Sequence, residues 1–505
     1  MKIFFKKYSF GFIILGIVAL YFFTRFYNLL GLPIFTDEAI YIRWSQIASN
    51  DAAWRFISLT DGKQPMYVWI TMILLKLIQD PLIAGRVTSI IAGFGSLIGL
   101  VLLSYEIFKN RKIALLTGFL YVLYPFSLVY DRMALYDSLV ALFIIWALYF
   151  EILLVRYVRL DLALILGMII GGGMLTKTNA NFAFILMPFL LLLFNFRDKE
   201  WKKKLGKLIL FLLTSLVIAN VMYTILRLSP FFHIIEAKNY VFIYPFSEWF
   251  MNPFGYFFTN VSAMSNWLFI YATGPLLVLI VSAFVISKKY YREKILLFLW
   301  FLVPFIALAF FGKNIYPRFI LFMTMPLLIL GSYALYHMVL MVRQVWIKAL
   351  IVIVFLGTFV FNDYFIITDF ARAHVPRSDH DQFYAGWPSG VGVKETVAFL
   401  EEKSQHEKIY VGTGGTFGLM PFALEIYFFD NPNVKVEGFW PIHDTPPQEV
   451  IDASREMTTY FVFYQECPSC KHVGLAPWQW PVEEIYQIEK EEPSRYYTLY
   501  QIKAQ

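Results

Sequence analysis

Two adjacent carboxylates, Asp37 and Glu38, follow the first of many apolar segments, within the stretch FTDEAIY at residues 35–41. Charged side chains are costly in or beside a bilayer, so acids in such a place often mark a functional site. A carboxylate there can take a proton from a hydroxyl group as a general base, while nearby cations stabilise an anionic leaving group. We therefore take this pair as the first candidate for chemistry.

The composition places these acids in a membrane protein. Of the 505 residues, 59% are hydrophobic and only 16% are charged, and the mean hydropathy is +0.59. A soluble chain of this size could not bury so much apolar surface. Segments of about 20 apolar residues recur, and at about 1.5 Å per residue each covers a hydrocarbon core of about 30 Å. The sequence thus predicts a polytopic all-α membrane domain.

About eleven segments are predicted to span the membrane. They lie near residues 10–27, 83–107, 113–130, 138–155, 161–176, 180–196, 207–228, 267–287, 294–311, 318–341 and 349–367. The apolar stretch 66–78 is shorter, follows Pro65 and contains Lys76, so we expect it to lie at the membrane surface. The membrane domain is predicted to cover residues 1–368, and a smaller domain covers 369–505.

The positions of Lys and Arg predict the orientation. Basic residues gather before the first predicted span and after every second span, within 2–7, 109–112, 156–159, 197–207, 288–294 and 343–348. Because cytoplasmic loops retain positive charge, we expect a cytoplasmic N-terminus. An odd number of spans then makes the C-terminal domain extracytoplasmic, in a multi-pass protein of the plasma (cytoplasmic) membrane.

The charge balance differs between the two predicted domains. Residues 369–505 contain 20 acidic and 11 basic residues, whereas residues 1–368 contain 16 acidic and 32 basic residues. A basic membrane domain matches loops that face anionic membrane lipid. The isoelectric point near 9.0 therefore gives no reason to expect a nucleic-acid partner.

Further polar residues gather on the predicted exterior side, including Lys63, Asp137, Lys177 and Arg318. Each alone has an ordinary explanation, because basic side chains at helix ends reach the headgroups and exterior acids are solvated. We favour that explanation for a second set, which comprises Arg86, Asp131, Arg132 and Lys313. The aromatic segment 231–258 suits lipid or sugar contact, although such belts more often anchor a protein.

The ordered set of exterior motifs resembles a known family. The motifs are DEAIY at 37–41, KQP at 63–65, GR at 85–86, YDRMALYD at 130–137, TK at 176–177 and PRF at 317–319. From its first span to its sixth, the chain resembles the dolichyl-phosphate-mannose protein mannosyltransferase superfamily and its relatives that transfer aminoarabinose to lipid A, which share the GT-C membrane fold.

Three positions depart from the family pattern. The family often has Pro where Gln64 stands, Gly where Thr178 stands and Tyr where Phe319 stands. A role that needs a phenol at position 319 is therefore not carried over.

The resemblance implies transfer of a sugar from a polyprenyl-phosphate donor, dolichyl or undecaprenyl, to a protein, lipid or glycan acceptor at the exterior face. It implies that Asp37 is the general base, with Glu38 positioning groups or tuning charge beside it. A phosphate leaves without a proton donor, so one base and several cations suffice.

Three cations, Lys63, Lys177 and Arg318, are the candidates to bind the donor phosphate. Tyr41 and Asp137 are expected to orient groups around the sugar or around Lys63. No cofactor is predicted with certainty, although Asp37 and Glu38 could hold a divalent cation, and the relatives are not defined by a metal motif.

The C-terminal residues predict a small α/β domain. Helical spacing covers 393–403 and 419–429, and buried strands are predicted near 408–411, 460–464, 485–488 and 496–502. The glycine-rich turn GTGGT at 412–416 could bind phosphate, but it lacks the Lys of a P-loop, so we interpret it as a tight turn. Cys467 and Cys470 form a C-x-x-C pair that fits a local disulfide or two thiols, with a redox-active pair as the alternative.

Two other function classes fit a polytopic chain with charged loops. A lipid or solute transporter or flippase usually shows inverted repeats and charges near the bilayer midplane, whereas here no repeat is evident and the charges lie at one surface. An accessory or receptor protein would leave the ordered motifs unexplained. We therefore favour the glycosyltransferase.

Overall fold

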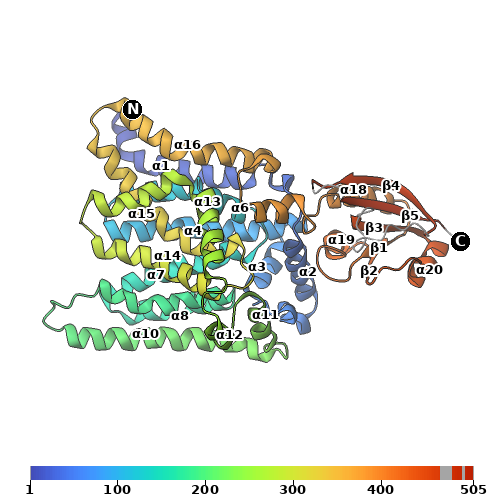
Figure 1. Cartoon of the computed structure of the whole chain (residues 1–505), viewed down its shortest axis with the longest axis horizontal. Coiled ribbons are helices and arrows are strands. Elements are labelled where there is room, and N and C mark those ends of the chain that lie inside the picture. The colour runs from blue at the N-terminus through green and yellow to red at the C-terminus, as the bar shows by residue number, and fades with distance from the viewer. Residues whose placement is uncertain (1, 467–479, 492–494, 504–505) are drawn as a thin grey trace. The chain divides into compact units, whose positions relative to one another are not determined.

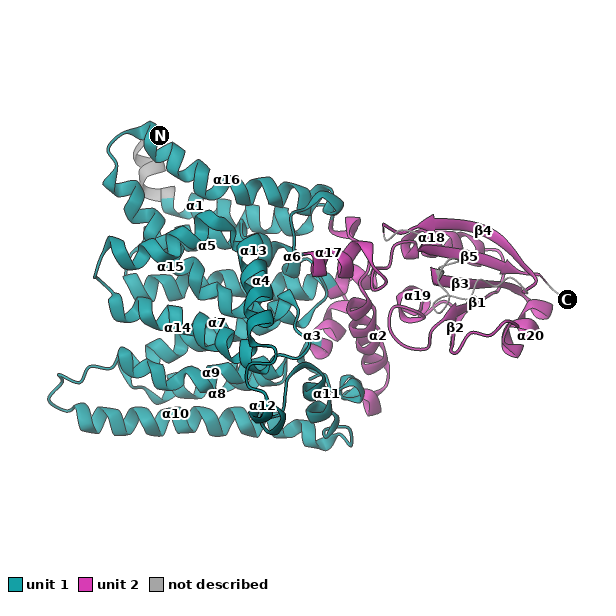
Figure 2. Ribbon diagram, viewed as in Figure 1, with its two compact units in different colours: residues 1–28, 55–67, 86–376 teal, residues 29–54, 68–85, 377–505 magenta. Residues whose placement is uncertain are grey.

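The structure is a computed structural model that describes residues 2–466, 480–491 and 495–503 (Figure 1). Cys467 and Cys470 lie outside the described residues. The chain divides into two compact units, coloured separately in Figure 2. The first unit comprises Met1–Asn28, Arg55–Tyr67 and Arg86–Pro376, and the second comprises Leu29–Trp54, Val68–Gly85 and Arg377–Gln505. The second unit thus combines two segments from the N-terminal part of the chain with the C-terminal domain.

The first unit is a bundle of helices. Its elements are α1 (Lys2–Phe26), α4 (Pro81–Phe108, from Arg86 on), α5 (Arg111–Val122), α6 (Pro125–Asp131), α7 (Tyr136–Tyr157), α8 (Leu160–Met174), α9 (Phe182–Leu186), α10 (Trp201–Tyr223), α11 (Ile234–Phe242), α12 (Phe246–Met251), α13 (Phe257–Ile286), α14 (Tyr291–Phe311), α15 (Leu321–Met341) and α16 (Val345–Thr368). Figure 1 shows the long helices side by side, with α11 and α12 near the end of the bundle away from the N-terminus. Nearly all of α15 is buried, among α5, α7, α13 and α14.

The predicted polytopic helical membrane fold is confirmed. Among the described residues, eight helical segments are long and apolar enough to span a membrane, at 10–31, 81–108, 136–157, 201–228, 257–286, 291–311, 317–341 and 345–368. The other three predicted spans are helical but not single long helices. Residues 111–131 form α5 and α6, which are bent by 59° just before Pro125, whose ring disfavours a continuous helix. Leu160–Met174 and Thr178–Leu192 are apolar helices shorter than 18 residues.

The second unit contains an α/β domain, as predicted. Its elements are α2 (Thr36–Asn50), α3 (Met66–Leu75, from Val68 on), α17 (Arg377–His380), α18 (Val393–Ser404), β1 (Ile409–Gly414), α19 (Phe422–Phe428), β2 (Val434–Phe439), α20 (Gln448–Glu456), β3 (Thr458–Glu466), β4 (Val482–Glu489) and β5 (Tyr496–Ile502). The strands form one sheet in the order β2-β1-β3-β5-β4, parallel from β2 to β3 and antiparallel through β5 and β4.

Within residues 393–503, strand β2 and helix α20 have no counterpart in the sequence prediction. Strand β2 lies at the edge of the sheet, and its apolar residues alternate with Lys435 and Glu437. Only Val434 in this strand is buried, so it lacks the continuous apolar run of a central strand.

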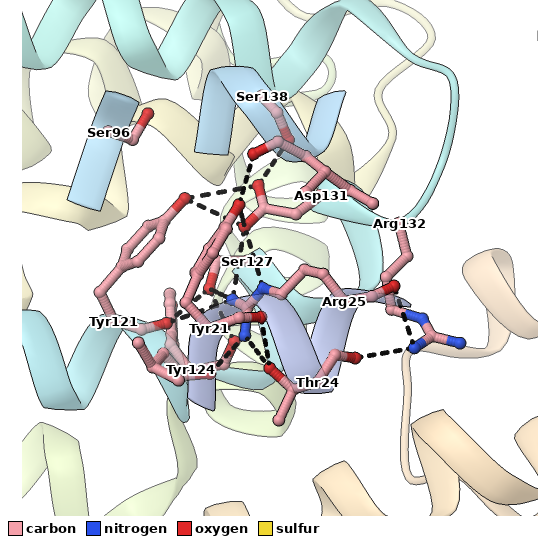
Figure 3. A network of polar contacts seen from close by, with 12 residues as sticks. Tyr21, Thr24, Arg25, Ser96, Tyr121, Tyr124, Ser127, Asp131, Arg132 and Ser138 are labelled. Carbon is pink, nitrogen blue, oxygen red and sulfur yellow. Dashed lines mark hydrogen bonds and ion pairs between the residues drawn. The ribbon is translucent and has the colours of Figure 1, made fainter. Parts of the chain in front are cut away.

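A buried ion pair ties α1 to the centre of the bundle (Figure 3). Arg25 Nη2 lies 3.3 Å from Asp131 Oδ2, and the two side chains are 0% and 1% exposed. Tyr121 donates to Asp131 at 3.1 Å and Ser138 at 2.8 Å, while Arg25 Nη1 donates to Val122 O. These bonds satisfy a buried charge pair that would otherwise be unstable. Asp131 therefore has a structural role.

Arg132 fixes the end of α1. Its Nη1 donates to Thr24 O and Tyr27 O, each at 2.8 Å, and its Nη2 donates to Asn28 O at 2.9 Å (Figure 3 shows the bond to Thr24). The last carbonyls of a helix have no partner within the helix. A guanidinium there donates to them, and its positive charge interacts favourably with the negative end of the helix dipole. Arg132 thus holds the last turn of α1 and residues 27–28.

Replacing Asp131 by Asn should destabilise the protein strongly. The change leaves the buried Arg25 charge uncompensated, which costs about 3–5 kcal/mol. Thermal unfolding in detergent measures the loss. The matched control is Asp161→Asn, which breaks an exposed pair with Arg159 and should cost no more than about 1 kcal/mol. Equal effects of the two variants would contradict the structural role of Asp131.

Candidate active site

Lys63 and Lys177 lie over two aromatic rings that touch each other. Lys63 Nζ is 5.3 Å from the centroid of the Phe242 ring, and Lys177 Nζ is 4.8 Å from that of Phe319. The two ring centroids are 5.7 Å apart, and the ring planes meet at 81°, edge to face. A cation over a ring face gains about 0.5–2 kcal/mol. The ring pair therefore fixes two of the predicted phosphate ligands in one place.

Arg318 belongs to the same group through the Tyr316 ring, which contacts the Phe319 ring. It precedes Phe319 in the turn Pro317–Ile320, and its guanidinium carbon lies 5.3 Å from the Tyr316 ring centroid. The Tyr316 and Phe319 centroids are 5.8 Å apart. The ring of Phe319 can perform this packing without a phenol, which accommodates the departure from the family pattern.

Asp137 orients Lys177. Lys177 Nζ donates to Asp137 Oδ1 at 2.7 Å, and the side chains are 21% and 6% exposed. Asp137 lies in the first turn of α7, where the helix dipole favours an acid. An ammonium carries three N–H donors, so a phosphate can share Lys177 with this carboxylate.

The other two departures from the family pattern contact each other. Gln64 Nε2 donates to Thr178 Oγ1 at 2.9 Å, and Thr178 Oγ1 donates to Asn239 Oδ1 at 3.3 Å. Pro and Gly at these positions could form neither bond, because they have no polar side chain. The contact joins the segment of Lys63 to that of Lys177.

Gly62 lets helix α11 approach the turn that carries Lys63. Its φ of +67° is in the left-handed region, and a Cβ there would lie 2.5 Å from Lys238 Cβ and 2.7 Å from Ile234 O. Lys238 Nζ also pairs with Asp61 Oδ1 at 2.6 Å. Helix α11 also contains Asn239 and Phe242. In the sequence, only the aromatic character of residues 231–258 indicated Phe242.

The candidate acids belong to α2 in the second unit. Glu38 is fully buried, and its Oε2 accepts the Phe35 N–H at 3.0 Å, which caps the start of the helix. Tyr41 is also buried, with its ring 5.8 Å from that of Trp44. Asp37 is the more exposed of the two acids. The structure therefore gives Glu38 a local structural bond at the start of α2.

The described residues contain no group of three or more His, Cys, Asp or Glu side chains that could hold a metal ion. A divalent cation at Asp37 and Glu38 would therefore take most of its ligands from water or substrate.

The fold is that of a known glycosyltransferase. ArnT from Cupriavidus metallidurans matches in its apo form with 14% identity and a TM-score of 0.57, and bound to undecaprenyl phosphate with 13% identity and a TM-score of 0.59. Each match covers 97% of both chains. The Archaeoglobus fulgidus oligosaccharyltransferase, tethered with an acceptor peptide, matches with 13% identity and a TM-score of 0.51, over 91% of this chain and 69% of that one. The chain therefore has the GT-C membrane fold.

Within that class, residues 62–223 match the family described as dolichyl-phosphate-mannose-protein mannosyltransferase. No curated protein sequence matches the chain. The predicted resemblance is confirmed, and the matched segment contains Lys63, Asp137 and Lys177. Asp37 and Arg318 lie outside it.

Replacing Gly62 by Ala should destabilise the protein. An L-residue in the left-handed region costs about 1–2 kcal/mol, and the added Cβ must also displace α11. The control is Gly206→Ala in α10, where a Cβ meets nothing within 4 Å and Ala should stabilise the helix by up to about 1 kcal/mol. Thermal unfolding compares them, and a Gly62→Ala protein as stable as the control would refute the close approach.

Proposed function

We propose that this protein is an integral membrane glycosyltransferase that moves a sugar from a polyprenyl-phosphate donor to an acceptor hydroxyl at the exterior membrane face. The observation that carries the proposal is the cluster of Lys63, Lys177 and Arg318 on touching rings. Cations in such a cluster suit a phosphate with an apolar tail, because the rings provide apolar surface beside positive charge. The similar ArnT structure bound to undecaprenyl phosphate supports this donor class.

Asp37 acts as the general base in the proposed reaction. Its carboxylate takes the proton of the acceptor hydroxyl while the hydroxyl oxygen forms a bond to the anomeric carbon of the sugar. The bond between that carbon and the phosphate oxygen breaks, and its electron pair leaves with the polyprenyl phosphate. Lys63, Lys177 and Arg318 stabilise the negative charge of the leaving phosphate.

Three residues serve the reaction indirectly. Glu38 holds the first turn of α2 through its bond to Phe35, and Asp137 holds Lys177. Tyr41 packs inside the second unit beside Trp44, which favours a role in supporting α2 over direct contact with the sugar.

The exterior location of the site is supported by charge. Basic residues before the first span and after every second span favour a cytoplasmic N-terminus. In that topology Lys63, Lys177 and Arg318 lie on the extracytoplasmic side.

Replacing Asp37 by Asn should lower the rate of transfer by about 10²–10⁴-fold, because the amide cannot accept the proton. The matched control is Glu38→Gln, since Gln can also form the capping bond and should keep activity within a few-fold. Transfer is measured with a polyprenyl-phosphate sugar and a membrane extract that supplies acceptors. Full activity of Asp37→Asn would remove Asp37 from the mechanism.

Replacing Lys63 by Gln should lower kcat/KM for the donor by about tenfold to a hundredfold, because a hydrogen bond to a charged group contributes about 1.5–3 kcal/mol. This variant keeps the Lys177–Asp137 pair intact, and the same transfer assay measures its kcat/KM.

Phe319→Leu should also weaken donor binding, whereas Phe319→Tyr keeps the ring and should bind normally. Binding of a polyprenyl phosphate distinguishes them, and equal affinity of the Leu and Tyr variants would argue against the ring.

A further inference from the structure

The start of α2 is fixed by residues 388–390 of the same unit. Ile34 O accepts the Gly390 N–H at 2.7 Å, and Thr36 donates to Pro388 O from both its N–H, at 3.0 Å, and its Oγ1, at 2.9 Å. A Cβ on Gly390 would lie 2.5 Å from Ile34 Cγ2, so the two segments pack without space for a larger residue. These bonds hold the backbone immediately before Asp37.

The body of α2 is held by helix α19. Arg43 Nε lies 2.5 Å from Glu425 Oε2, with the side chains 17% and 20% exposed. The Arg43 guanidinium carbon also lies 4.9 Å from the centroid of the Phe429 ring. One turn further along, Gln46 Nε2 donates to Ile426 O at 2.7 Å in a buried contact. Charge, ring and amide contacts thus bind one face of α2 to one helix of the C-terminal domain.

Helix α2 needs such support. It has 15 residues, and isolated helices of this length are marginal in water. Its own cap, from Glu38 to Phe35, satisfies one backbone donor but does not fix the direction of the helix. That direction comes from the contacts with 388–390 and α19.

We infer that the C-terminal domain holds α2 in the orientation that presents Asp37, which makes Arg43, Glu425 and Gln46 positioning residues for the transfer. This inference rests on the proposed function, since it takes Asp37 as the base. It assigns the domain a role in the chemical step, because a misplaced base can cost about a hundredfold in rate. The donor cations lie in the first unit, so we expect donor binding to be unchanged.

The test uses the full-length protein in detergent or vesicles. Glu425→Gln and Arg43→Gln each remove one charge of the pair, and the double variant Arg43→Glu with Glu425→Arg restores a pair with reversed sign. The control is Arg455→Gln, which breaks an exposed pair with Asp452 within α20 of the same domain. Two readouts are taken, hydrogen–deuterium exchange of residues 36–50 and the kcat and donor KM of transfer.

We expect faster exchange in residues 36–50 and a kcat lowered by about tenfold to a hundredfold in both single variants. Donor KM should be unchanged, the charge reversal should recover most of the activity, and Arg455→Gln should behave like the wild type. Rescue and a split between kcat and KM separate positioning from a general loss of folding.

Unchanged exchange in residues 36–50 would overturn the inference. So would a rise in donor KM with constant kcat, which would make the domain a donor-binding element. The Asp37→Asn variant measured in the same assay tests the proposed function separately. If that variant is inactive while Glu425→Gln has faster exchange and normal kcat, the base stands and the positioning role fails.

Discussion

The buried ion pair between Arg25 and Asp131 is the interaction on which the rest of the bundle depends. A charge in a low-dielectric interior persists only with its opposite charge and enough hydrogen bonds. Here those partners come from α1, α5, α6 and α7, so satisfying one carboxylate fixes four elements at once. Arg132 then caps the end of α1.

The candidate site handles charge in a different way. Lys63 and Arg318 lie over ring faces, and Lys177 combines a ring with Asp137. A ring attracts a cation through its quadrupole. The pair Arg25–Asp131 holds helices together through opposite charges, whereas this cluster gathers three cations beside aromatic rings.

The two adjacent acids differ in their surroundings. Glu38 is buried and its carboxylate accepts the capping bond of α2, whereas Asp37 is more exposed in the same turn. The helix that carries them packs on α19 through Arg43 and Gln46. The C-terminal domain and a segment near the N-terminus therefore form one unit, although more than 300 residues separate them in the chain.

The sequence by itself determined the class of fold, because apolar runs, basic loops and the periodicity of the C-terminal strands are local properties of the chain. It also indicated Lys63, Lys177 and Arg318 through motifs of short range. Tertiary structure alone decided the bend before Pro125, the edge strand β2, the contact of Gln64 with Thr178 and the ring pair of Phe242 and Phe319. These contacts join residues that are far apart in sequence. A phenylalanine or a glutamine is too common in such a chain for its contact partner to be predicted before the chain folds.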